Sequence, residues 1–357
     1  MAHVATITID HTKVPGDLTD YVGLIVPDGS AGYSALYALC LEGGGDIRLF
    51  KSDDTTELAR EIVSFSVSAE TGEIHYKYSG TLSSSVDTDI HVYADGSSAD
   101  YAVTATYGRN NVWDDYEVVL HLKETSGSIA VNSVGSNNFS YVGSLPNYSA
   151  TLPLGGQNLD GAGDWMQKIG TIFAGDQDPL TYQMWLNLDN LSGDYGQNAL
   201  IGEGKNGINQ TRNYLYVGES TEEVLYDQYP PSDNTVSSSG YSFAINTNIL
   251  LHFTKSSNTS TFFKNGSSVS SGTHSETYSG GTPDKTFIGA VDVVSTRERE
   301  LDGDIGEVRI KTTALPANYI TTEYNNQNSY STFYSVAAVA GGSTSAQAAR
   351  RGVIMMM

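Results

Sequence analysis

Four acidic residues near the end of the chain, Glu300, Asp302, Asp304 and Glu307, have the spacing closest to a catalytic arrangement. Two carboxylates on one strand face, one a nucleophile and one a general acid, can cleave a glycosidic bond. Side chains alternate along a strand, so the first three share a face, and Glu307 joins them only at a bulge. The pattern Glu-x-Asp-x-Glu of such enzymes is absent. We therefore predict that these carboxylates are structural.

The histidines do not supply a metal or catalytic set by their spacing. Seven are present, and His75, His91 and His121 each fall singly in a stretch of strand-like sequence. An isolated strand histidine is more often packed or solvated than catalytic. The sequence also lacks a Gly-x-Ser-x-Gly elbow, a phosphate-binding loop and a His-Glu-x-x-His motif. These observations predict that the protein is not an enzyme.

Composition and charge limit the number of domains and the kinds of partner that the protein can have. The chain has 357 residues, enough for two domains, and a formal net charge of −22. Such an acidic chain repels phosphate backbones and anionic lipid surfaces, so we expect no nucleic-acid partner and no membrane insertion. Solubility is the ordinary explanation of the acidity, and attraction of calcium is the alternative. The single cysteine, Cys40, lies in an apolar stretch and is predicted to be buried.

The first third of the chain reads as a series of short strands. Ala5, Ile7 and Ile9 alternate with polar residues, as in a half-buried strand. Turn residues separate further strand-like stretches, which are 21–26, 46–50, 62–67, 73–78 and 89–93. Many short strands with regular turn signals indicate an antiparallel sandwich. A further strand, 118–122, is expected to open a second sandwich.

The remainder of the chain carries five motifs in a recognisable order. They are LDGAGDW (159–165), YQMWL (182–186), TFFKNG (261–266), LDGDIGEVRI (301–310) and a helix-like stretch at 315–324. Together they resemble a laminin-G-like domain of the concanavalin-like jelly-roll class. Two positions depart from the family pattern. Gly306 stands where the family usually has an aspartate, and Leu250 to Phe253 replaces a stretch that usually opens with tryptophan.

The first unit also resembles a known type of domain. GDIRLF, IHVYA and NVWDDYEVVLHL are similar to a small β-sandwich family of unassigned function that precedes laminin-G-like domains in bacterial and phage surface proteins. The predicted fold is all-β, with two β-sandwiches in tandem and a short C-terminal tail. Its expected parts are an N-terminal sandwich over 1–112, a jelly roll over 113–330, and a docking tail over 331–357.

The resemblance implies two kinds of binding site on loops at the rim of the jelly roll. Laminin-G-like domains often hold one calcium ion there, and the implied ligands are Asp160, Asp164, Asp302 and Asp304. The alternative is that these are solvated turn aspartates. Aromatic loop residues stack on sugar rings, and the candidates are Tyr195, Tyr229 and Tyr241. Trp165 and Trp185 match strand positions of the family, so we expect them in the core.

The chain ends in an apolar run that is suited to docking, Val353, Ile354, Met355, Met356 and Met357. No signal peptide is visible, and no apolar run reaches membrane-spanning length. The resemblance implies a non-enzymatic component of a phage-like particle, a fibre, tail or capsid decoration, made in the host cytoplasm and located in the virion. Its partners would be other virion proteins, further copies of itself and host-surface glycans. The alternatives are a stand-alone carbohydrate-binding module and, less favoured, a polysaccharide-degrading enzyme.

Overall fold

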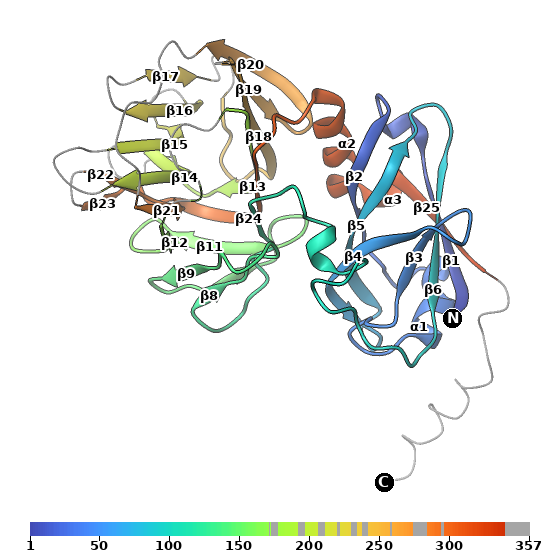
Figure 1. Ribbon diagram of the computed structural model, residues 1–357. Helices are drawn as coiled ribbons and strands as arrows, with labels where there is room; N and C mark the ends of the chain where they lie inside the picture. Colours follow the sequence, from blue (N-terminus) through green and yellow to red (C-terminus); the bar gives the residue numbers. More distant parts are fainter. Residues whose placement is uncertain are drawn as a thin grey trace, which may run out of the picture. The chain divides into compact units, whose positions relative to one another are not determined.

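The computed structural model describes residues 1–170, 172, 178–191, 197–205, 211–219, 222–229, 234–237, 242–257, 259–273, 284–293 and 296–339. The described residues divide into two compact units, the first made of residues 1–114 and 321–339 and the second lying within residues 115–320. Both are built of antiparallel strands, which confirms the predicted all-β class (Figure 1). Among the described residues, no helix is long and apolar enough to cross a membrane.

The first unit is a seven-stranded arrangement in the order β2-β5-β4-β3-β6-β1-β25. Its strands are β1 (Ala2–Ile9), β2 (Leu18–Ile25), β3 (Arg48–Lys51), β4 (Glu57–Ser66), β5 (Thr71–Leu82), β6 (Thr88–Ala94) and β25 (Tyr334–Ala338). Its short helices are η1 (His11–Lys13), η2 (Ala31–Tyr33), α1 (Ser34–Leu39), η3 (Arg109–Asn111) and α3 (Tyr330–Phe333). Strand β4 pairs with β3 at its start and with β5 along the rest, so it joins the two halves of the sandwich.

Local sequence accounts for most of these strands. In β1, Ala5, Ile7 and Ile9 are buried and the residues between them are half-buried, as the alternation predicts. The β4–β5 hairpin turns at Glu70, which takes a left-handed φ of 53° just before Gly72. Cys40 is buried with 3% of its surface exposed, and burial raises the pKa of its thiol above the usual range.

The C-terminal segment differs from the expected docking tail. Strand β25 pairs with β1 from Ala5↔Ala338 to Ile9↔Tyr334, so residues far apart in the sequence lie side by side (Figure 1). The Tyr334 hydroxyl accepts a hydrogen bond from the backbone N–H of Val26 at 2.8 Å. Residues 331–339 therefore belong to the first sandwich, because the open edge of β1 offers backbone groups that need partners. The predicted docking residues Val353 to Met357 lie outside the described part of the chain.

The end of helix α2 (Ala317–Asn328) also belongs to the first unit. The side-chain oxygen of Asn326 accepts hydrogen bonds from the Leu24 N–H at 2.7 Å and from the Tyr21 hydroxyl at 3.2 Å. Its amide donates to the Leu24 carbonyl at 2.9 Å. One buried amide thus satisfies backbone groups of β2 on the sheet edge. The expected helix over 315–324 is present, but it begins and ends later than predicted.

The second unit consists of two large sheets. One sheet has the order β10-β11-β24-β13-β18-β19-β20, with β7 also pairing with β24, and the other has the order β17-β16-β15-β14-β21-β12-β9-β8. The strands of the first are β7 (Val118–Leu120), β10 (Tyr148–Ser149), β11 (Gly156–Asp160), β13 (Leu180–Leu188), β18 (Ile249–Ser256), β19 (Thr259–Lys264), β20 (Ser267–Thr273) and β24 (Asp302–Lys311). Those of the second are β8 (Ile129–Ala130), β9 (Phe139–Val142), β12 (Trp165–Ile169), β14 (Gln197–Lys205), β15 (Thr211–Gly218), β16 (Val224–Tyr229), β17 (Asn234–Ser237) and β21 (Lys285–Ile288), and a hairpin joins β22 (Val291–Val293) to β23 (Thr296–Glu298).

One apolar core fills the space between these two sheets. Leu186 of β13, Phe253 of β18 and Ile305 of β24 contribute to it from one sheet, and residues such as Leu215 of β15 and Ile288 of β21 contribute from the other. Phe253 is fully buried, and its ring lies 4.5 Å from the ring of Tyr226, measured between centroids. Trp165 and Trp185 are both buried, at 8% and 1% exposure, as predicted. Such a core lets loops vary at the rim without loss of the fold.

Candidate carboxylate site at the rim of the second unit

Three acidic residues lie at neighbouring strand ends, where β11 and β13 end and β24 begins. Asp160 is the last residue of β11, Asp302 is the first residue of β24, and the two are direct partners across the ladder. Asp189 follows the last residue of β13, and its N–H donates to the Asp302 carbonyl at 3.1 Å. The site therefore depends on three strands being neighbours in one sheet.

The electrostatics of this carboxylate cluster, Asp160, Asp189 and Asp302, show that its charges are close together. Partial burial raises the pKa of Asp302, and the nearby charges of Asp189 and Asp160 raise it further. Asp160 and Asp189 are exposed, whereas Asp302 is half-buried. The Asp302 N–H donates to the side-chain oxygen of Asn198 at 3.2 Å, which holds the start of β24 in place. Repelling carboxylates of this kind are relieved by a bound cation.

The structure brings together only part of the predicted calcium set. Asp164 is buried and accepts hydrogen bonds from Ser144, from its N–H at 2.6 Å and from its hydroxyl at 2.7 Å, so it stabilises a turn. Asp304, two residues after Asp302 on β24, is buried and lies opposite Asn187 in the ladder. Asp189 was missed by the sequence reasoning. Its position just after a predicted strand, at the same sheet end as the LDG motif, was the available signal.

Two buried side-chain oxygens lie further along the same strands, away from the carboxylate cluster. The Oδ1 atoms of Asp304 and Asn187 have no hydrogen-bond partner among the described residues. The Asn187 amide donates instead to Asn248 at 2.7 Å. Two facing acceptors without a donor are suited to a water molecule or a cation.

The predicted aromatic residues cannot be joined to this cluster by contacts. Tyr195 and Tyr241 lie outside the described residues. Tyr229 ends strand β16, where its backbone is opposite Arg212, and its side chain is not part of the description. The three tyrosines remain predictions.

On strand β24, the carboxylate of Glu307 is not available to form a catalytic pair with another acidic residue. Glu307 has a left-handed φ of 48° where the β13–β24 register shifts, so a bulge sits at the glutamate itself rather than at a neighbouring glycine. It is fully buried and is bound to Arg309 at 2.9 Å and to His121 at 2.8 Å. These contacts occupy both carboxylate oxygens of Glu307.

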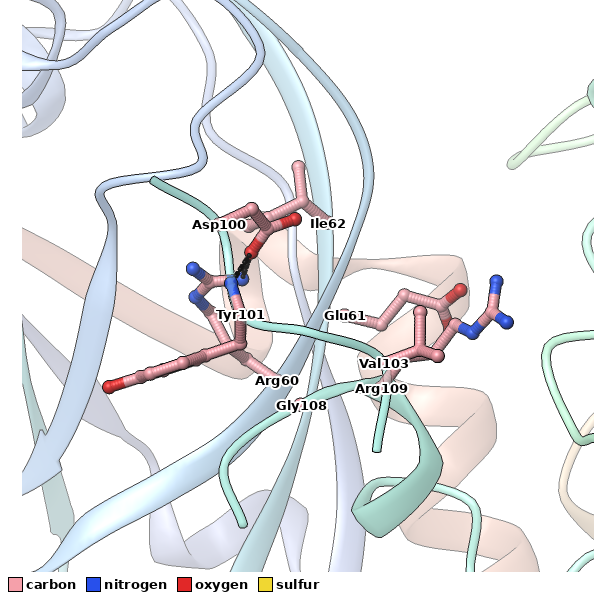
Figure 2. Close-up of a pocket in the computed structure, with 8 residues that line it drawn as sticks. All are labelled: Arg60, Glu61, Ile62, Asp100, Tyr101, Val103, Gly108 and Arg109. Carbon is pink, nitrogen blue, oxygen red and sulfur yellow. Dashed lines mark hydrogen bonds and ion pairs between the residues drawn. The ribbon is translucent and has the colours of Figure 1, made fainter. Parts of the chain in front are cut away.

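A small pocket lies in the first unit, beside β4 and the segment from Asp100 to Arg109 (Figure 2). Its volume is about 120 Å³. The buried Arg60 donates to Asp100 at 2.8 Å and to the Gly45 carbonyl at 3.0 Å, while the Arg109 side chain points away from it (Figure 2). Ligand pockets usually measure about 300–1,000 Å³, so this one suits water or a small ion rather than a sugar.

Part of the second unit is similar to a known protein family. Residues 160–321 match the family model of the concanavalin A-like lectin/glucanases superfamily, of the laminin-G type. No curated protein matches the chain.

Solved structures to which the chain is similar include the receptor binding domain of botulinum neurotoxin C/D mosaic serotype, at 13% identity over 60% of this chain and 52% of that one, with a TM-score of 0.44. Another is Trypanosoma rangeli sialidase in complex with sialic acid, at 12% identity over 76% of this chain and 45% of that one, with a TM-score of 0.43. The chain spans about half the length of these structures. By its sequence match and its two-sheet core, the segment from residue 160 to residue 321 is similar to the laminin-G type of the concanavalin A-like lectin/glucanases superfamily and has a concanavalin-like jelly-roll fold.

Proposed function

We propose that the second unit is a glycan-binding module whose rim holds a calcium ion on Asp160, Asp189 and Asp302. The observation that carries this proposal is that three acidic residues, two of whose charges act on the third, lie at neighbouring strand ends of one sheet. Calcium takes six to eight oxygen ligands, which carboxylates, backbone carbonyls and water supply. Exposed Asp160 and Asp189 leave part of the ion open, and sugar hydroxyls are oxygen ligands of the same kind.

We also propose that the module is not an enzyme. Glycoside hydrolysis needs two carboxyl groups facing each other across the bond to be cleaved. In the closing strand, Glu307 is held by Arg309 and Asp304 is buried. The glycan would therefore be bound and released without reaction. An activity screen on polysaccharides, with Glu300→Gln as the control, tests this: turnover that disappears in the variant would contradict the proposal.

The test of the binding proposal uses the full chain on a glycan array, once with calcium and once with a chelator. We expect binding in calcium and at least a tenfold loss in Asp302→Asn, which keeps the side-chain shape but removes the charge. Glu219→Gln is the matched control, because Glu219 is an exposed carboxylate of the same unit outside the carboxylate cluster. Equal binding by wild type and Asp302→Asn with and without calcium would overturn the role of the ion.

The predicted tyrosines give a separate test of sugar contact. An aromatic stacking contact contributes about 0.5–1.5 kcal/mol. If each tyrosine stacks on a sugar ring, Tyr195→Ala, Tyr229→Ala and Tyr241→Ala should each weaken glycan binding several-fold. Calcium binding should stay unchanged in all three. If glycan affinity is unaffected in every variant, the sugar is recognised through the ion and the loop backbone instead.

A second proposal is that the protein is a structural component of a phage-like particle, located in the virion and made in the host cytoplasm. It is supported by the pairing of β25 with β1, which ties the chain down before the apolar residues 353–357. That run could then dock on other virion proteins or on copies of the chain. Repeated copies would strengthen weak glycan contacts through avidity. Quantitative mass spectrometry of purified particles tests this: absence of the protein from them would contradict it.

A further inference from the structure

A second group of possible metal ligands lies on the outer face of the first sandwich. It consists of His3 on β1, His91 on β6 and Asp54 in the turn between β3 and β4. Strand β6 pairs with both β1 and β3, so the three residues come from neighbouring parts of one sheet. The ladder between β1 and β6 shifts register between His3 and Ala5. This bulge re-aims the His3 side chain relative to a regular strand.

The donor atoms of this histidine cluster, His3, Asp54 and His91, are close enough to share an ion. One ligand atom from each residue lies within 4.8 Å of the others, and the two imidazole rings are 4.3 Å apart between centroids. The His91 Nδ1 is 2.5 Å from the Asp54 Oδ1. Donors around a tetrahedral zinc ion lie about 3.3 Å apart at the usual bond lengths, so small rotations of these partly buried rings would complete the site.

Neighbouring groups orient the ligands. His3 Nε2 lies 3.0 Å from the Ala5 carbonyl, which accepts its N–H and leaves Nδ1 with a lone pair. The Tyr93 hydroxyl donates to the Asp54 Oδ1 at 2.8 Å, and the His3 and Tyr93 rings stack at 5.0 Å. Outer partners of this kind hold metal ligands in place in known sites. Asp54 itself has a left-handed φ of 57°, so the turn places its carboxylate at a backbone cost.

We propose that His3, Asp54 and His91 bind a divalent transition-metal ion of the zinc class on the outer face of the first unit. Imidazole nitrogen with one carboxylate suits zinc, nickel and copper, whereas calcium and magnesium prefer oxygen alone. Three protein ligands leave a coordination position open to water or to a partner's side chain. The net charge of −22 favours cations near the surface.

A second cluster in the same unit provides the matched control. His11 lies beside Asp10 and Asp87, with its Nδ1 2.7 Å from the Asp87 Oδ1. It offers a single nitrogen donor. Its carboxylates already have local partners, because Asp10 accepts from the Thr12 N–H at 2.8 Å and Asp87 from the His11 N–H at 3.1 Å. His11→Gln therefore removes a similar histidine–carboxylate pair while leaving the histidine cluster intact.

The experiment is calorimetric titration of the full, untagged chain with zinc chloride, together with the visible spectrum of the cobalt-loaded protein. We expect one ion per chain, and a cobalt spectrum typical of nitrogen ligands. His91→Ala should lower zinc affinity at least about tenfold, and so should Asp54→Asn, since asparagine tolerates the left-handed turn but lacks the charge. Circular dichroism checks that each variant is folded.

Three results would overturn the proposal. The first is no stoichiometric zinc uptake by the wild type. The second is unchanged affinity in Asp54→Asn and His91→Ala when both are folded. The third is a loss in His11→Gln as large as that in His91→Ala, which would place the ion at the other cluster.

Discussion

The histidine cluster of the first unit and the carboxylate cluster of the second differ in their donor atoms and in how the chain assembles them. His3, Asp54 and His91 lie on the outer face of a sheet and offer nitrogen and oxygen. Asp160, Asp189 and Asp302 lie at strand ends and offer oxygen alone. Donor type selects the ion, so the first set should prefer zinc and the second calcium. One acidic chain can thus present two cation sites that do not compete.

The two units also differ in continuity. The second is one uninterrupted segment, whereas the first needs residues 321–339 to complete it. Damage to the second unit should therefore leave the histidine cluster intact. A destabilising substitution in residues 321–339, the returning segment, should weaken the first unit and leave the carboxylate cluster unchanged.

The largest effect is expected from Phe253→Ala in the core of the second unit. Its ring is fully buried against Tyr226, Phe262 and Tyr182. Removing it should cost about 3–5 kcal/mol of unfolding free energy, because the cavity cannot fill completely. Denaturant titration measures the loss. Calcium-dependent glycan binding should fall, while zinc binding stays at the wild-type level; joint loss of both would show that the two sites are not separate.

An intermediate effect is expected from Tyr334→Phe in the returning segment. The hydroxyl of this buried residue satisfies the Val26 N–H at 2.8 Å and receives the Tyr33 hydroxyl at 3.4 Å. Its loss leaves a buried donor unpaired, at about 1–3 kcal/mol. Tyr148→Phe is the control, since Tyr148 is 43% exposed and its hydroxyl loss should change stability by under about 0.5 kcal/mol. Equal stability of both variants would argue that residues 334–338 do not hold the first unit together.

The smallest effect concerns the pH dependence of the carboxylate cluster without calcium. The raised pKa of Asp302 means that the folded chain holds this proton more tightly than the unfolded chain does. Its contribution to stability is therefore fully present below the unfolded pKa of about 3.9 and is lost as the pH rises through the folded value. In chelator, Asp302→Asn should melt up to about 2–4 °C higher than wild type at neutral pH and equally at acid pH.

Adding calcium should reverse that order. The ion stabilises only the protein that binds it, so the wild type should gain melting temperature and Asp302→Asn should not. Thermal scans at several calcium concentrations measure the difference. If the wild type melts at the same temperature with and without calcium, the carboxylate cluster does not bind the ion.

The chain's own pattern predicted much of both sandwiches. Alternation in β1, the turn at Glu70 and the LDG and YQMWL motifs indicated strands that the structure contains. These signals are local, because side-chain alternation and turn residues act over a few positions. The burial of Cys40 followed from its apolar neighbours in the sequence, and that of Trp185 from the family resemblance.

Only the tertiary structure decided which distant residues meet. The family resemblance grouped Asp160 with Asp164, Asp302 and Asp304, whereas the ladder pairs Asp160 with Asp302 and the strand order adds Asp189. His91 was read as an isolated strand histidine, yet the β1–β6–β3 order places it beside His3 and Asp54. Residues 334–338 were read as the start of a tail, yet they pair with β1. Such contacts depend on long-range strand pairing, which a local pattern does not encode.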